Sequence, residues 1–99
     1  MAQTIPVVVT QHAIEEMASI AYYIADRGLP ETAKRYYDRM LAFAETLGHM
    51  PNKYAICRKR VFKRWNYRCA VFENSYVFIY KIHNDTVRLL SVLHGRQLR

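Results

Sequence analysis

Cysteine, glycine and proline are scarce in this sequence, with two, three and three of them among 99 residues. The low glycine and proline content argues against long flexible linkers. The hydrophobic share of 52% is typical of a chain with a packed core. A chain of this length can form one such core and is too short for two. We therefore predict a single domain over residues 1–99.

The two cysteines cannot make a recognisable redox or zinc motif. Cys57 and Cys69 are separated by more than the CxxC spacing, and no further cysteine completes a zinc site. We expect both to be reduced thiols, with Cys69 in the core. The histidines are scattered along the chain, so we predict neither a metal site nor a cofactor.

Long hydrophobic runs are absent as well. No stretch approaches the roughly 18 apolar residues that a membrane span needs. The first six residues lack the positive charge and the apolar run of a secretion signal. We therefore expect a soluble protein in the cytoplasm that has no membrane partner.

Acidic residues are missing mainly from the second half of the chain. Residues 1–50 contain six acids and four bases, whereas residues 51–99 contain two acids and eleven bases. Residues 53–68, here called the basic segment, contain seven cations, four aromatic residues and no acid. The cations are Lys53, Arg58, Lys59, Arg60, Lys63, Arg64 and Arg68. Such one-sided charge favours a nucleic acid or an acidic protein partner, although a solvated loop has the same composition.

The first half predicts a short strand followed by two helices. A β-branched run at residues 5–9 ends at Thr10, a residue type that caps helix N-termini. Apolar residues at helical spacing then predict a helix over residues 11–27, closed by Gly28, and a second helix from Pro30 to about Gly48. The short connection makes them an antiparallel hairpin. We expect the tyrosine pairs of this hairpin to pack against each other or a sheet.

After the basic segment the pattern changes to three strands, at residues 68–73, 76–83 and 86–93. Asn74-Ser75 and Asn84-Asp85 join them at the length of tight hairpins, which predicts an antiparallel meander. The fold class is α+β: an N-terminal strand and an antiparallel helical hairpin packed on the antiparallel β-meander, with the basic segment crossing at the edge. Both faces of the middle strand are apolar, so we expect a partner to cover the open face.

Few residues of the second half could act in catalysis. RNA cleavage needs proton transfer and cations around the phosphate, and His94, directly before Gly95 and Arg96, is the best-placed titratable group. It could face a phosphate, or it could hydrogen-bond a backbone carbonyl in a structural corner. No P-loop, Ser/His/Asp order or paired-carboxylate spacing is present, so hydrolase, kinase and nucleotide-binding functions lack residues.

Several runs have an order and spacing that cover nearly the whole chain. They are residues 13–24, residues 30–38, Tyr67-Arg68, residues 76–82, and residues 87–93 followed by His94-Gly95-Arg96. Together they resemble the ParE/RelE superfamily of toxins from type II toxin–antitoxin systems. The resemblance implies a small α+β toxin that an antitoxin neutralises by wrapping an acidic or amphipathic C-terminal part around it.

The superfamily divides by target. ParE-like members poison DNA gyrase, whereas RelE-like members cleave mRNA on the ribosome with Lys and Arg side chains and a C-terminal Tyr or His. The long hairpin and the His94-Gly95-Arg96 ending are closer to the ParE-like branch and to a plasmid-stabilisation role. The dense cations between Asn52 and Asn66 depart from that branch and would suit an RNA-directed toxin. No Tyr or His follows His94.

Three hypotheses follow. The first is a ParE-like gyrase inhibitor that acts by surface binding without catalysis, and the second is a RelE-like mRNA endonuclease with His94, Arg68 and Arg64 as catalytic residues. The third is an inactive basic binding protein of the same fold. We expect the target or nucleic acid to be bound by Lys53, Arg58, Lys59, Arg60, Lys63, Arg64, Arg68 and Arg96.

Overall fold

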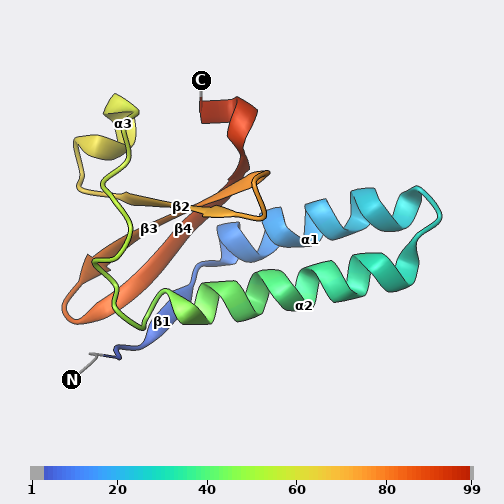
Figure 1. The fold of residues 1–99 in the computed structure, drawn as a ribbon, viewed down its shortest axis with the longest axis horizontal. Helices are drawn as coiled ribbons and strands as arrows, with labels where there is room; N and C mark the ends of the chain where they lie inside the picture. The colour runs from blue at the N-terminus through green and yellow to red at the C-terminus, as the bar shows by residue number, and fades with distance from the viewer. Residues whose placement is uncertain (1–3, 99) are drawn as a thin grey trace.

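The computed structural model describes residues 4–98, which form a four-stranded sheet with a helical hairpin on one face (Figure 1). The sheet order is β1-β4-β3-β2. The elements are β1 (Val7–Val9), α1 (Gln11–Asp26), α2 (Pro30–Thr46), α3 (Arg60–Lys63), β2 (Arg68–Phe72), β3 (Tyr76–His83), β4 (Thr86–His94) and the 3-10 helix η1 (Gly95–Leu98). The predicted α+β class is confirmed. The prediction of one domain over residues 1–99 includes residues 1–3 and 99, which lie outside the described residues.

The helical hairpin begins and turns at the predicted residues. The Thr10 hydroxyl oxygen accepts a hydrogen bond from the Ala13 N–H (3.2 Å), and the hydroxyl donates to the Leu89 carbonyl on β4 (2.8 Å). Gly28, with φ of 82°, follows α1, and Pro30 is the first residue of α2. Thr10 thus fixes both the start of α1 and its position against the sheet. Within residues 4–98, no helix has the length and apolar character needed to cross a membrane.

The predicted meander is confirmed, with one turn different. β3 is antiparallel to both β2 and β4, and residues 84–85 form the predicted two-residue turn with φ values of 50° and 55°. The other turn has three residues, because Phe72 pairs with Tyr76 and residues 73–74 take left-handed φ values of 48° and 61°. β1 adds to the sheet parallel to β4, which the sequence pattern did not indicate.

The sheet face toward the hairpin, here called the inner face, holds the main core. Phe78 and Tyr80 of β3 are fully buried there together with Met17 and Met40 of the helices. The Tyr80 hydroxyl donates to the Pro51 carbonyl (2.7 Å), and burial raises the pKa of Tyr80 to about 12. Large apolar side chains thus hold the hairpin on the sheet.

The tyrosine prediction is right for α2 and wrong for α1. Tyr36 packs edge-on against Phe72 with 5.6 Å between ring centroids, and Tyr37 packs against the same core. Tyr22 and Tyr23 are instead 78% and 56% exposed. The hairpin extends beyond the sheet (Figure 1), so the end of α1 has no strand to pack against.

On the opposite sheet face, here called the outer face, the middle strand is covered by the chain itself, whereas Val71 of β2 stays 57% exposed. Val77 and Ile79 of β3 pack there with Cys57 and Phe62 of the basic segment and with Leu98 of η1. In Figure 1, α3 and η1 lie on the side of the sheet away from the hairpin. The expectations that a partner covers this face and that the basic segment crosses only at the edge are therefore wrong. An apolar sheet face is stabilised when another part of the chain packs on it and removes it from water. The basic segment can do so because it is connected directly to β2.

Candidate functional site

Backbone hydrogen bonds and a disulfide hold the basic segment on β2. The Cys57 N–H donates to the Tyr67 carbonyl (2.8 Å), and the Cys69 N–H donates to the Ala55 carbonyl (3.2 Å). This ladder brings the two cysteine Cα atoms to 5.0 Å, and their sulfur atoms are bonded. The prediction of two reduced thiols is wrong in this structure, and it is Cys57 that lies in the core.

Between the two cysteines the chain makes one helical turn. α3 begins after Lys59, whose carbonyl accepts the Lys63 N–H (2.9 Å), and Asn66 at φ of 62° then reverses the chain toward β2. The side chains of Arg60, Lys63 and Arg64 have i, i+3 and i+4 spacing, so they share one side of this turn. Sequence reasoning missed α3 because four residues are too few to show helical periodicity.

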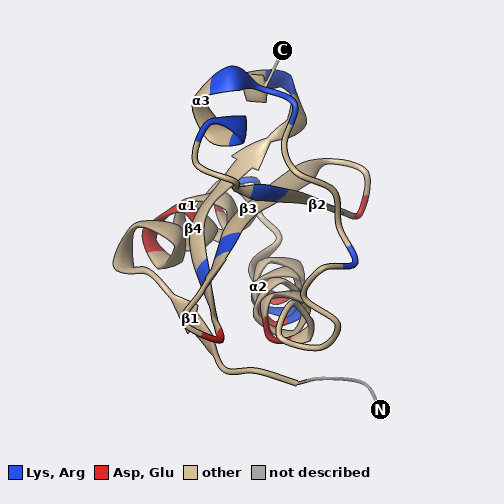
Figure 2. Cartoon of the chain, turned by 90° about the vertical axis from the view of Figure 1, so that its left-hand side faces the viewer, with Lys and Arg blue, Asp and Glu red and all other residues tan. Residues whose placement is uncertain are grey.

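Four side chains around α3 line one open depression of about 560 Å³, here called the cationic depression. They are Arg58, Arg60, Lys63 and Arg64. All four are exposed, and within residues 4–98 none of them forms an ion pair with Asp or Glu. Figure 2 shows the Lys and Arg positions of α3 at the end of the molecule away from the hairpin. Four of the eight expected binding residues are thus brought together with uncompensated charge.

Two other cations of the basic segment make internal contacts. The Arg68 guanidinium donates to the Tyr54 carbonyl and to the Asn52 side-chain oxygen, so it holds the preceding chain against β2. The Lys59 ammonium donates to the Gln97 carbonyl (3.3 Å) and connects the start of α3 to η1. Lys59 thus supports the outer layer of the fold, whereas Arg68 holds a chain segment whose Tyr54 packs on the inner-face core.

The remaining expected cations, Lys53 and Arg96, do not line the cationic depression. The Lys53 ammonium lies 5.4 Å from the centre of the Tyr54 ring. Arg96 is exposed on η1. Their expected role in target binding stays a prediction.

Three of the four aromatic residues in the basic segment point inward. Phe62 and Tyr67 meet edge-on at 6.2 Å in the outer-face core, and Tyr54 packs on a phenylalanine of α2. Trp65 is 55% exposed, and the Arg64 guanidinium lies 5.6 Å from its ring centre. The described part of the basic segment therefore offers one exposed ring rather than a row on which unpaired bases could stack.

His94 lies in a structural corner at the end of β4. Its ring meets Tyr76 edge-on with 5.3 Å between centroids, and its Nδ1 accepts the Arg96 N–H (3.1 Å). The His94 backbone N–H donates to the Gln97 side chain (2.8 Å). These contacts place His94 in a structural corner, although its ring accepts a backbone N–H and was expected to bind a backbone carbonyl.

The three expected catalytic residues occupy three different places. Arg68 pairs with Tyr80 in the middle of β3, whereas His94 pairs with Tyr76 at the start of the strand. At the rise of a strand, these two positions are separated by about 13 Å. Arg64 lines the cationic depression instead. No shared site for phosphate binding and proton transfer is formed by Arg68, His94 and Arg64.

A polar pocket of about 300 Å³ lies beside His94 and includes His12, Glu15 and Glu16. The Glu16 carboxylate accepts hydrogen bonds from the Ser91 hydroxyl (2.6 Å) and from a backbone N–H of β4 (2.9 Å). Glu16 therefore ties α1 to the sheet, a role that sequence reasoning missed because the partners are far apart in the chain. Within residues 4–98, no three His, Cys, Asp or Glu side chains are grouped so as to hold a metal ion.

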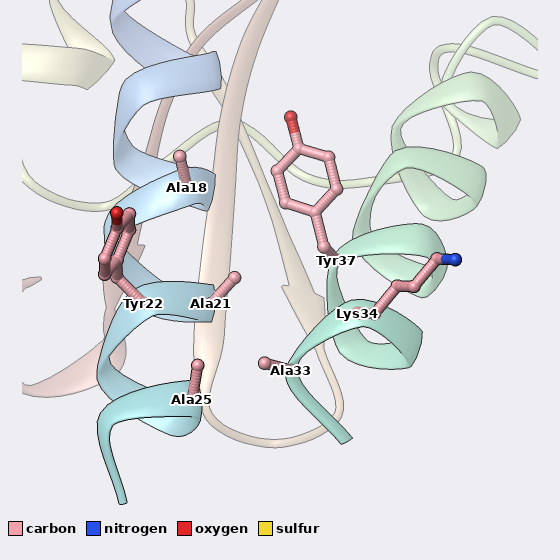
Figure 3. Close-up of a pocket in the computed structure, with 7 residues that line it drawn as sticks. All are labelled: Ala18, Ala21, Tyr22, Ala25, Ala33, Lys34 and Tyr37. Atoms are coloured by element: carbon pink, nitrogen blue, oxygen red, sulfur yellow. The ribbon is translucent and has the colours of Figure 1, made fainter. Parts of the chain in front are cut away.

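An apolar hollow of about 330 Å³, here called the hairpin groove, lies between α1 and α2 near their connection (Figure 3). It is lined by Ala18, Ala21, Tyr22, Ala25, Ala33, Lys34 and Tyr37. The alanines of the two helices face each other without filling the space between them, since their side chains end at Cβ.

Similarity to known proteins agrees with the resemblance found in the sequence. A family model described as "ParE toxin of type II toxin-antitoxin system, parDE" matches residues 7–99. Among solved structures, the fold is similar to a chain from the "Chromosomal ParDE TA system from P. aeruginosa", at 12% identity and a TM-score of 0.74. That alignment covers 92% of this chain and 96% of the other. No curated protein sequence matches this chain significantly.

Proposed function

Because this chain belongs to the family of ParE toxins of type II toxin–antitoxin systems, we propose that it arrests growth by binding and inhibiting DNA gyrase. The family match over residues 7–99 carries the assignment as a toxin. The separation of Arg68 from His94 supports binding rather than catalysis, because RNA cleavage needs its proton-transfer group beside the phosphate. A cognate antitoxin reverses the inhibition by covering the toxin.

The best candidate surface for the gyrase contact is the α3 region. Arg64 and Trp65 lie next to each other there, and Val61 is 54% exposed on the same short helix. Arginine and tryptophan are the residue types most enriched among side chains that dominate binding energy. The disulfide holds this region before the target arrives, which lowers the entropy lost on binding.

The gyrase proposal is tested by supercoiling of plasmid DNA with purified gyrase and purified toxin. We expect inhibition that rises with toxin concentration, together with accumulation of cleaved DNA. Arg64→Gln combined with Trp65→Ala should weaken inhibition by at least about tenfold. His94→Gln is the matched control in the corner of β4 and should inhibit like the unchanged protein. Full supercoiling at high toxin concentration would refute the proposal.

The two other hypotheses give different results in cells. An mRNA endonuclease would cleave ribosome-bound mRNA after induction, and His94→Gln would remove its toxicity. An inactive binding protein would cause no growth arrest when induced without a partner gene. Growth arrest that persists in His94→Gln without mRNA cleavage would leave gyrase inhibition as the remaining hypothesis.

The hairpin groove is our candidate surface for the antitoxin. It is apolar and open, and exposed Tyr22 extends its wall. Filling it with Ala21→Arg should preserve growth arrest but reduce rescue by the co-expressed antitoxin. Thr32→Arg, an exposed position of α2 outside the groove, adds the same side chain and should leave rescue intact. Equal rescue of both variants would place the antitoxin elsewhere.

A further inference from the structure

The cations of the cationic depression repel one another, and within residues 4–98 no ion pair with Asp or Glu offsets this repulsion. Arg60 and Arg64 have i, i+4 spacing across one helical turn, where like charges destabilise a helix. The acids of the second half lie at the turns of the meander, and one of them, Glu73, is paired with Arg39 of α2 (2.8 Å). Because the repulsion between these cations destabilises the fold, their concentration at one place implies that they bind a polyanionic ligand.

The lining of the depression has the chemistry of a phosphate-binding surface. Three of its four side chains are arginines, whose planar guanidinium groups bind phosphate oxygens through two parallel hydrogen bonds. All four side chains are donors only, so none can accept the 2′-hydroxyl proton that distinguishes RNA. The lining therefore matches the phosphate groups that DNA and RNA share and contains no acceptor for the 2′-hydroxyl proton.

The rigidity of this region and its scarcity of exposed aromatic rings favour a duplex ligand over a single-stranded one. Proteins that bind single strands stack the bases on exposed rings, but Phe62 and Tyr67 are turned into the outer-face core. The Cys57–Cys69 disulfide closes the loop that carries all four cations, which holds their backbone positions. A fixed set of cations suits the regularly spaced phosphates of a duplex backbone.

We propose that the cationic depression of Arg58, Arg60, Lys63 and Arg64 binds the phosphodiester backbone of duplex DNA. The proposal goes beyond gyrase inhibition, because the contact is with DNA itself and forms without gyrase. In a complex of toxin, gyrase and DNA, the other cations of the depression would hold DNA beside the gyrase contact of Arg64 and Trp65. The contact is independent of base sequence, since backbone phosphates are the same at every step.

Direct binding is measured by fluorescence anisotropy of a short labelled DNA duplex with the purified full-length chain and no gyrase. Each neutralised phosphate contributes about −0.9 to the slope of log affinity against log salt, so four cations predict about −3.6. Affinity should therefore fall by about a hundredfold between roughly 50 and 200 mM salt.

A pair of matched variants locates the site. Arg60→Gln with Lys63→Gln should weaken binding and make the salt slope shallower by about 2. Arg27→Gln with Arg35→Gln removes the same net charge from exposed positions outside the hairpin groove and should change neither quantity. Thermal unfolding of both double variants checks that the fold is intact.

Absence of binding at low salt, or an equal loss in both double variants, would overturn the proposal. Tighter binding of duplex RNA or of single-stranded DNA of equal length would overturn the assignment to duplex DNA. Displacement of the duplex by polyglutamate at a lower concentration than by unlabelled duplex would assign the depression to an acidic protein segment instead. The assay contains no gyrase, so DNA binding together with unimpaired supercoiling would refute the gyrase proposal alone.

Discussion

The two faces of the sheet are covered in different ways. The helical hairpin covers the inner face with large buried side chains, among them Phe78, Tyr80, Met17 and Met40. The basic segment and η1 cover the outer face with a much smaller buried core and one disulfide. Burial of apolar surface keeps the helical hairpin on the inner face. On the outer face, the disulfide adds to the stability that a small core provides.

This difference explains how the molecule can carry concentrated charge without disrupting its core. In the basic segment, Phe62 and Tyr67 pack toward the sheet, whereas the side chains of Arg60 and Lys63 are exposed to water. A segment held by a few inward contacts and a disulfide can use its other side chains for binding. The core-facing side chains of the helical hairpin cannot be used for binding in this way, because their close packing determines the stability of the fold.

The largest expected effect comes from breaking the inner face. Phe78→Ala removes a fully buried ring and should lower the free energy of unfolding by about 3–5 kcal/mol. Chemical denaturation measures this change. Val71→Ala, at an exposed position of β2, is the control and should cost less than about 0.5 kcal/mol. Similar losses in both variants would show that the inner core does not dominate stability.

A smaller effect is expected from breaking the link on the outer face. Cys57→Ala with Cys69→Ala should lower the free energy of unfolding by about 3 kcal/mol, the cost expected for a loop of this size. Dithiothreitol should destabilise the unchanged protein by a similar amount and should not affect the double variant. Two thiols that react in the native, unreduced protein would contradict the disulfide.

The smallest expected effect concerns a single hydrogen bond between the sheet and the loop before the basic segment. Tyr80→Phe leaves the Pro51 carbonyl without its partner and should lower the free energy of unfolding by about 1 kcal/mol at neutral pH.

The same variant also tests the alkaline behaviour of the inner face. Burial raises the pKa of Tyr80 from 10.0 to about 12, so the folded state keeps a proton that the unfolded state loses. The contribution of Tyr80 is fully present below pH 10 and is lost as pH rises toward 12. Stability of Tyr80→Phe should therefore fall less steeply in this range than that of the unchanged protein. Parallel pH profiles would contradict the assignment.

Most of the fold could be predicted from the sequence because its signals are local. Thr10, Gly28 and Pro30 act within a turn of the helices that they start or end. The mostly apolar run of residues 76–83 between turn residues likewise indicates a single strand. The three-residue turn after Phe72 differed from prediction because Glu73 takes a left-handed conformation that its residue type does not favour.

The candidate site could be predicted only in part. The charge of the basic segment was visible in the sequence, but α3 and the disulfide were not. The disulfide depends on the ladder between residues 55–57 and 67–69, which sequence spacing does not indicate. For the same reason, the sequence could not show that Arg68 and His94 pair with the middle and the start of β3.

By itself, the sequence determined the helices, the meander, the position of the positive charge and the resemblance to the family. Only the tertiary structure decided that β1 pairs with β4, that the basic segment covers the outer face, and that four cations gather around α3. It also decided the contact at Gly48, where an added Cβ would lie 2.2 Å from the Ile5 carbonyl oxygen. Caps, turns and periodicity act between neighbours in the chain, whereas pairing and covering depend on contacts between distant residues that form only when the chain packs.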